Sequence, residues 1–106
     1  MKPCSESDWK LFRTKIAEWQ ERYMGKIDAK LAKILSDETL SSGERFWKAE
    51  KLMSREKKSA GVIVEMSRSL FKMNLLRLLK EKVITLEDLS EFSPELQEEI
   101  RRLWEE

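Results

Sequence analysis

One apolar stripe constrains the fold of this 106-residue chain more than any other feature of its sequence. Because its steps of three and four residues match the period of an α-helix, it predicts one helix over residues 5–35 with a single buried side. Such a helix is about 45 Å long. The stripe consists of Trp9, Phe12, Ile16, Trp19, Tyr23, Ile27, Leu31 and Ile34.

Cap signals place the other helix boundaries. Ser5 with Asp8, and Ser41 with Glu44, have the spacing of a capping box, in which a hydroxyl and a carboxylate each bond the other residue's backbone N–H. Pro94 is typical of the first position of a helix. Together with the apolar periodicity, these signals predict helices over residues 5–35, 42–58, 62–82, 86–91 (short) and 94–104.

The scarcity of helix breakers fixes the fold class. Three Gly and two Pro leave few places for turns, so we predict an all-α, single-domain helical bundle of about four helices with a long N-terminal helix. Gly25 allows a bend or a close helix crossing in that helix. The predicted helix over residues 62–82 is apolar on two faces, so it should pack between two partners, either both from this chain or one from a second copy.

Missing residue types exclude most catalytic chemistry. The chain has no histidine, one cysteine (Cys4) and no Gly-rich phosphate loop, and no carboxylate pair lies in an apolar setting. We therefore predict a protein that is not an enzyme, with no cofactor and no metal ligands. Short apolar runs, the lack of a signal sequence and the lone cysteine predict a soluble protein of the reducing cytoplasm without membrane contact.

The aromatic stripe has two interpretations. The simpler one is that it forms the core. However, a helix of this length would project beyond a bundle of shorter helices, and a homodimer or another protein partner could cover its apolar ends. The candidate partner or dimer interface comprises Trp9, Phe12, Ile16, Trp19, Tyr23, Phe71, Leu75 and Leu78.

The net charge of +1 conceals an uneven distribution along the chain. Residues 44–82 carry eleven cations and five anions, whereas residues 83–106 carry two cations and eight anions. One hypothesis is that the acidic tail folds against the basic middle and neutralises it. The other is that the second predicted helix offers a basic, partly aromatic face to nucleic acid. The candidate nucleic-acid face comprises Trp47, Lys48, Lys51, Arg55 and Lys58.

Three blocks of the sequence carry a resemblance. Met1–Pro3 followed by Ser5–Arg13, then Glu65–Ser69 and Ile84–Ser93, resemble a family of short proteins of unknown function from Gram-positive gut bacteria. Members of that family look like mobile-element cargo and are often labelled multidrug transporters. The label does not fit this chain, because no segment of the sequence is apolar for long enough to cross a bilayer. The resemblance implies a regulator or an inhibitor of another protein.

The sequence therefore predicts a non-enzymatic protein–protein interaction module, with a homodimer as one form of the interaction. The alternative is a nucleic-acid-binding accessory protein that uses the basic face of the second helix.

Overall fold

The computed structural model describes residues 4–106 and contains four α-helices and no strand within that range, which confirms the predicted all-α class. Met1–Pro3 of the opening block lie outside the described residues. In chain order the elements are α1 (Glu6–Leu35), α2 (Ser42–Glu56), the 3-10 turn η1 (Arg68–Leu70), α3 (Phe71–Lys80), the 3-10 turn η2 (Leu86–Leu89) and α4 (Pro94–Glu105).

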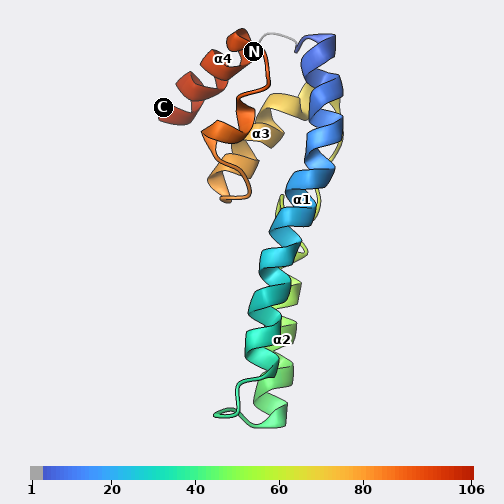
Figure 1. Ribbon diagram of the computed structural model, residues 1–106, viewed down its shortest axis with the longest axis vertical. Helices are drawn as coiled ribbons and strands as arrows, with labels where there is room; N and C mark the ends of the chain where they lie inside the picture. The colour runs from blue at the N-terminus through green and yellow to red at the C-terminus, as the bar shows by residue number, and fades with distance from the viewer. Residues whose placement is uncertain (1–3) are drawn as a thin grey trace.

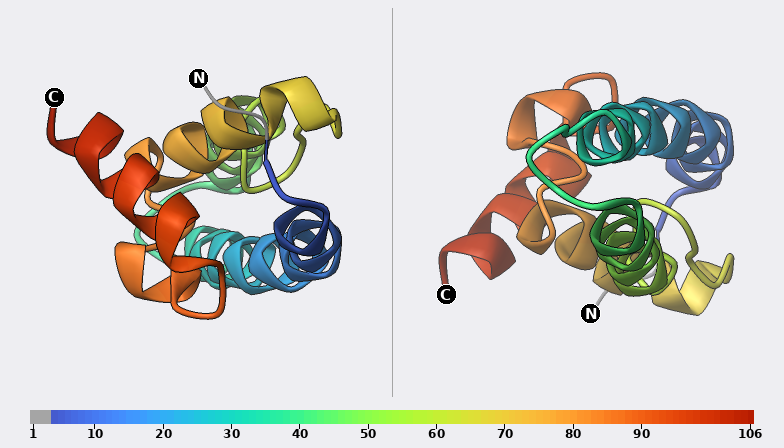
Figure 2. Two further views of the ribbon diagram at one scale, coloured as in Figure 1. Left: turned by 90° about the horizontal axis from the view of Figure 1, so that it is seen from above. Right: turned by 90° about the horizontal axis from the view of Figure 1, so that it is seen from below.

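The molecule is elongated and has two parts (Figure 1). Its extents are 52 × 24 × 20 Å, and its radius of gyration is 16.8 Å, against about 13 Å for a compact domain of this length. We call residues 4–23 together with 58–106 the head, and residues 24–57 the arm. The arm is an antiparallel hairpin of the second half of α1 and α2, which lie side by side in every view (Figures 1 and 2).

The head contains the main core. Phe12, Phe71, Leu75, Leu78 and Ile100 are completely buried in it. The rings of Phe12 and Phe71 have centroids 4.7 Å apart, and Trp9 and Trp19 contact Phe12 on either side at 6.0 and 6.2 Å. The first half of the apolar stripe therefore faces α3 and α4, while Ile27 and the residues after it face α2.

At the start of α1, only one of the two hydrogen bonds of the expected capping box is present. The Ser5 hydroxyl accepts the backbone N–H of Asp8 at 3.1 Å, as predicted. The buried Asp8 carboxylate, however, accepts the backbone N–H and the hydroxyl of Ser93 at 2.9 and 2.6 Å, instead of the backbone of Ser5. Ser93 is the N-cap of α4, so Asp8 holds the beginnings of the first and last helices together.

The predicted third helix is wrong over residues 62–70. Residues 63–67 are irregular, and α3 begins only at Phe71. Three consecutive β-branched residues, Val62–Val64, disfavour a helix here, and the Asn74 side chain holds the irregular segment by donating to the Glu65 carbonyl at 2.8 Å. Ile63 is consequently exposed, so the second apolar face that seemed to require a partner does not exist as a helix face.

The end of α3 is a Schellman motif. Val83 N–H donates to the Leu78 carbonyl at 2.9 Å, and Lys82 N–H donates to the Leu79 carbonyl at 3.1 Å. Lys82 has a φ of 61°, the left-handed conformation that this motif requires and that glycine adopts more easily. The chain thereby turns sharply from α3 towards η2.

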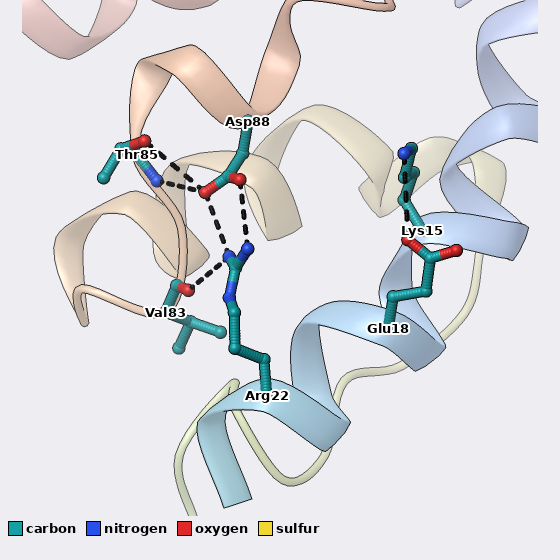
Figure 3. Close-up of polar contacts among 6 residues, drawn as sticks. All are labelled: Lys15, Glu18, Arg22, Val83, Thr85 and Asp88. Atoms are coloured by element: carbon teal, nitrogen blue, oxygen red, sulfur yellow. Dashed lines mark hydrogen bonds and ion pairs between the residues drawn. The ribbon is translucent and has the colours of Figure 1, made fainter. Parts of the chain in front are cut away.

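An arginine from the middle of α1 clamps the segment after α3 (Figure 3). Both terminal nitrogens of Arg22 donate to the Asp88 carboxylate, at 3.2 and 3.0 Å, and one also donates to the Val83 carbonyl at 3.3 Å. Asp88 at the same time accepts the backbone N–H of Thr85 at 2.8 Å, which completes the capping box of η2. Burial alone would raise the pKa of Asp88, but the hydrogen bonds from Arg22 and Thr85 outweigh it and lower that pKa.

The connection from α2 to the head is tightly packed. Gly61 is buried beneath the ring of Tyr23, where an added Cβ would lie 2.1 Å from the nearest ring atom. The Tyr23 hydroxyl donates to the Glu56 carboxylate, and the Gln20 side chain donates to the Ala60 carbonyl at 3.1 Å. This junction fixes the direction in which the arm leaves the head.

The arm has few buried residues. Ile27, Ala49 and Leu52 fill the seam between its helices. Nothing lies within 4 Å of an added Cβ at Gly25, so no close helix crossing occurs there, and α1 continues through it. The chain's own α2, rather than a second copy, covers the projecting half of α1 (Figure 2).

Candidate functional site

The predicted partner interface lies in the interior. All eight of its residues pack in or against the head core, so a partner could reach them only by displacing the chain's own helices. The structure places Trp9, Phe12, Ile16, Trp19, Phe71, Leu75 and Leu78 among the buried residues, and Tyr23 against them at the junction.

The predicted nucleic-acid face lies mostly on the surface of the arm. Trp47, Lys48, Lys51 and Arg55 are exposed on α2. The predicted helix over residues 42–58 instead ends at Glu56, so Lys58 leaves this face. Its backbone carbonyl accepts a hydrogen bond from Arg77 in the head at 2.6 Å.

Two lysines that the sequence analysis did not single out complete this surface. Lys30 and Lys33 project from α1 and, with α2, line a groove of about 530 Å³ on one side of the arm. We call it the basic groove; its lining residues are Lys30, Lys33, Ile34, Asp37, Lys48, Lys51, Leu52 and Arg55. Their spacing of three residues places Lys30 and Lys33 on one face of a helix, but nothing in the sequence showed that this face would lie beside α2.

The cations of the basic groove have little internal compensation. Within residues 4–106, its four lysines form no ion pair, and Arg55 has a single contact with Glu56 at 3.4 Å. The one carboxylate in the lining, Asp37, accepts the hydroxyl and the backbone N–H of Thr39 at 2.6 and 3.0 Å. These bonds, assisted by the nearby charges of Lys48 and Arg45, lower the pKa of Asp37. The groove therefore carries five positive charges and one negative charge.

The acidic tail does not neutralise this groove. One ion pair, Lys72–Glu99, joins residues 44–82 to residues 83–106 within the described chain. Other tail carboxylates pair with α1: Asp88 with Arg22, and Glu91 with Lys15 at 2.7 Å. Figure 1 shows α4 beside α3, at the far end of the molecule from the arm. Within the described residues the tail therefore pairs with α3 at Lys72 alone, and it forms no ion pair with α2.

The opposite side of the arm is apolar. Met53 is 48% exposed, and Phe46 is 61% exposed. Leu35 at the end of α1 is 53% exposed. Phe46 and Met53 are seven residues apart and so share one face of α2, as Leu31 and Leu35 share one face of α1. We call Met24, Leu31, Leu35, Phe46 and Met53 the apolar side of the arm.

A shallow groove of about 290 Å³ runs along this apolar side. Its apolar lining consists of Met24, Ile27, Leu31, Met53 and Val62. Its rim carries the carboxylates Glu21, Asp28 and Glu56 and the cation Lys57. The two sides of the arm therefore differ in charge, because one is rimmed by cations and the other mainly by carboxylates.

Trp47 lies between these two sides. Its side chain is 66% exposed, and its ring meets that of Phe46 edge to face, with centroids 5.1 Å apart. Four residues separate Trp47 from Lys51, so the two are neighbours on the surface of α2. Trp47 is not part of the lining of the basic groove, but its exposed indole lies next to Lys51, which is.

A third hollow, of about 380 Å³, lies between the start of α1 and α4. Its charged side chains hold the head together: Lys72 pairs with Glu99, and Asp8 caps α4 through Ser93. The half-buried Cys4 also lines it. These contacts connect α1, α3 and α4 and have a structural role.

Metal and membrane chemistry find no support in the described residues. Residues 4–106 contain no group of three or more His, Cys, Asp or Glu side chains arranged to hold a metal ion. No helix in the same range combines the length and apolarity that a bilayer span requires. Comparisons of the chain with protein-family models, curated proteins and solved structures found no match.

Proposed function

We propose that the chain is a non-enzymatic protein–protein interaction module that binds its partner through the apolar side of the arm. The observation that carries this proposal is that Leu35, Phe46 and Met53 are exposed on a projecting hairpin and that Met53 lines an apolar groove between its two helices. Aromatic and methionine side chains are enriched in interface cores, and a large exposed apolar patch is typical of an interaction surface. The head core does not include these side chains.

The charges around this surface favour one kind of partner. Glu21 and Asp28 at the rim would meet lysines or arginines, so the occupant is an amphipathic protein segment with an apolar face and basic flanks. A regulator or inhibitor of a cytoplasmic protein fits this mode of binding, and the resemblance to mobile-element cargo favours the same role. A second copy of the chain is a less favoured partner, because the apolar side would have to meet an equally acidic rim in a symmetric dimer.

A site-specific photocrosslinker tests the proposal in cells that express the chain natively. We expect the crosslinker at position 46 to give a discrete protein adduct that a second substitution, Met53→Asp, removes. The matched control is the same crosslinker at Met73, an exposed apolar residue of the head, which should not give that adduct. Identical adducts from both positions, or none from position 46, would contradict the proposal.

Light scattering of the purified chain distinguishes the form of the interaction. A monomer whose mass is unchanged by Phe46→Asp supports a different protein as partner. A dimer that Phe46→Asp dissociates would identify the partner as a second copy and contradict the expected basic segment.

A further inference from the structure

The basic groove concentrates positive charge that has few ion-pair partners among the described residues. Five cations surround it, Asp37 is engaged by Thr39, and no other carboxylate lines it. Charged side chains that stabilise a fold generally have partners, as Arg22 and Lys72 have in the head. A cluster of this size, in which Arg55 alone has an ion pair among the described residues, attracts an anionic ligand from outside.

The length of the groove and the positions of its cations suit an extended anion. Lys48 and Arg55 are seven residues apart on α2, which is about 10 Å along the helix axis, and Lys30 and Lys33 follow α1 on the other wall. Two antiparallel rows of cations thus face a channel long enough for at least two successive phosphates of one strand, which lie about 3.4 Å or more apart. A single phosphate would engage only part of this arrangement.

Next to these cations are apolar and aromatic side chains, the kind that contacts bases instead of phosphates. Ile34 and the buried Leu52 form an apolar floor, and Trp47 stands at the outer edge of the cationic row on α2. Aromatic rings bind unpaired bases by stacking, whereas the bases of a duplex are already stacked on one another. Cations in a groove beside an open indole are the combination found in proteins that bind single strands.

We propose that the basic groove binds the phosphate backbone of single-stranded nucleic acid, with a base stacked on Trp47. This inference goes beyond the proposed protein–protein function, because it concerns the other side of the arm and other side chains. An acidic protein segment is the competing occupant, since it would meet the same lysines but would not need an exposed indole.

Fluorescence anisotropy with defined probes tests the inference on the full chain. The probes are a fluorescein-labelled 20-nucleotide oligo(dT), a 20-base-pair duplex and a labelled poly-glutamate peptide. We expect the oligo(dT) to bind most tightly at low salt. If three to five phosphates are contacted, log K should fall against log salt with a slope of about −2 to −3.5.

Charge-reversal variants locate the site. The triple variant Lys48→Glu, Lys51→Glu and Arg55→Glu should weaken oligo(dT) binding at least tenfold. The matched control places the same three reversals on exposed, unpaired cations of the head (Lys10, Arg13 and Lys80), so that both variants change the net charge by −6. The control should retain most of the affinity. Circular dichroism establishes that both variants are folded.

Tryptophan variants separate nucleic acid from an acidic peptide. Trp47→Ala should weaken oligo(dT) binding about fivefold or more and leave poly-glutamate binding unchanged. The control is Trp104→Ala, which removes an exposed tryptophan on α4 at the other end of the molecule. No oligo(dT) binding at low salt, equal losses in both charge-reversal variants, or tighter binding of poly-glutamate or duplex would overturn the inference.

Discussion

The head and the arm use the same long helix in different ways. In the head, α1 contributes four large side chains to a core cluster that also includes residues of α3 and α4. In the arm, the same helix meets a single partner, and only Ile27, Ala49 and Leu52 are buried. The exposed aromatic pair and the lysines of the basic groove lie on the arm. Stability is therefore concentrated in one part of the molecule and surface chemistry in the other.

The largest expected effect is in the head. Phe12 is completely buried among Trp9, Trp19 and Phe71, so Phe12→Ala should lower the free energy of unfolding by about 3–5 kcal/mol. Urea denaturation measures this loss. The matched control, Phe46→Ala on the arm, should change the same free energy by less than about 0.5 kcal/mol. Equal losses in the two variants would remove the distinction between head and arm.

The seam of the arm should respond locally. Leu52→Ala should cost about 2 kcal/mol, because it leaves a gap between two helices that have few other buried contacts. Hydrogen exchange measures where this cost appears. We expect faster exchange for residues 24–57 and unchanged exchange for α3 and α4. Faster exchange throughout the chain would show that the arm and head unfold as one unit.

Two glycine substitutions compare the packed junction with the exposed surface of the arm. Gly61→Ala should destabilise the protein by about 1–3 kcal/mol, because the new methyl group would overlap the ring of Tyr23. Gly25→Ala, on the exposed surface of the arm, should stabilise it by about 1 kcal/mol, since alanine is the better helix former and nothing lies close by. Thermal unfolding measures whether each variant is more or less stable than the wild type. A Gly61→Ala variant as stable as the wild type would contradict the tight packing at the junction.

The smallest expected effect concerns pH. The lowered pKa of Asp88 means that its carboxylate stabilises the folded state above about pH 4, and that this stabilisation disappears as the pH falls through the lowered value. Asp88→Asn should therefore have a lower Tm than the wild type at pH 7, with the difference shrinking towards pH 2. A constant difference in Tm across this range would contradict the role of the Arg22 clamp.

The sequence predicted the elements whose signals are local. The stripe from Trp9 to Ile34 and the Ser5 cap were enough for α1, and Pro94 marked the beginning of α4. The prediction of a helix over residues 62–70 was wrong because it relied on Ile63 and Met66, which fit a helical period. Both residues follow a glycine, and Ile63 lies within a run of β-branched residues. Periodicity alone could not show that the segment would be held in an irregular conformation.

The site was harder to predict because it depends on how separate segments meet. The cations on α2 were visible as a row, but Lys30 and Lys33 become part of the groove only when α1 and α2 form a hairpin. Counting charges by segment suggested that the tail neutralises the middle, yet the tail carboxylates Asp88 and Glu91 pair with α1 instead. The aromatic stripe was a candidate interface until α3 and α4 covered it.

Hydrogen exchange of the full chain, with and without the 20-nucleotide oligo(dT), tests most directly that the head supplies stability and the arm supplies binding. Without the oligonucleotide, we expect slow exchange in α3 and in the first half of α1, and faster exchange in residues 24–57. With it, additional protection should appear in residues 24–57 and nowhere in α3 or α4. Protection centred on the head, or an arm that exchanges as slowly as the head, would contradict this division.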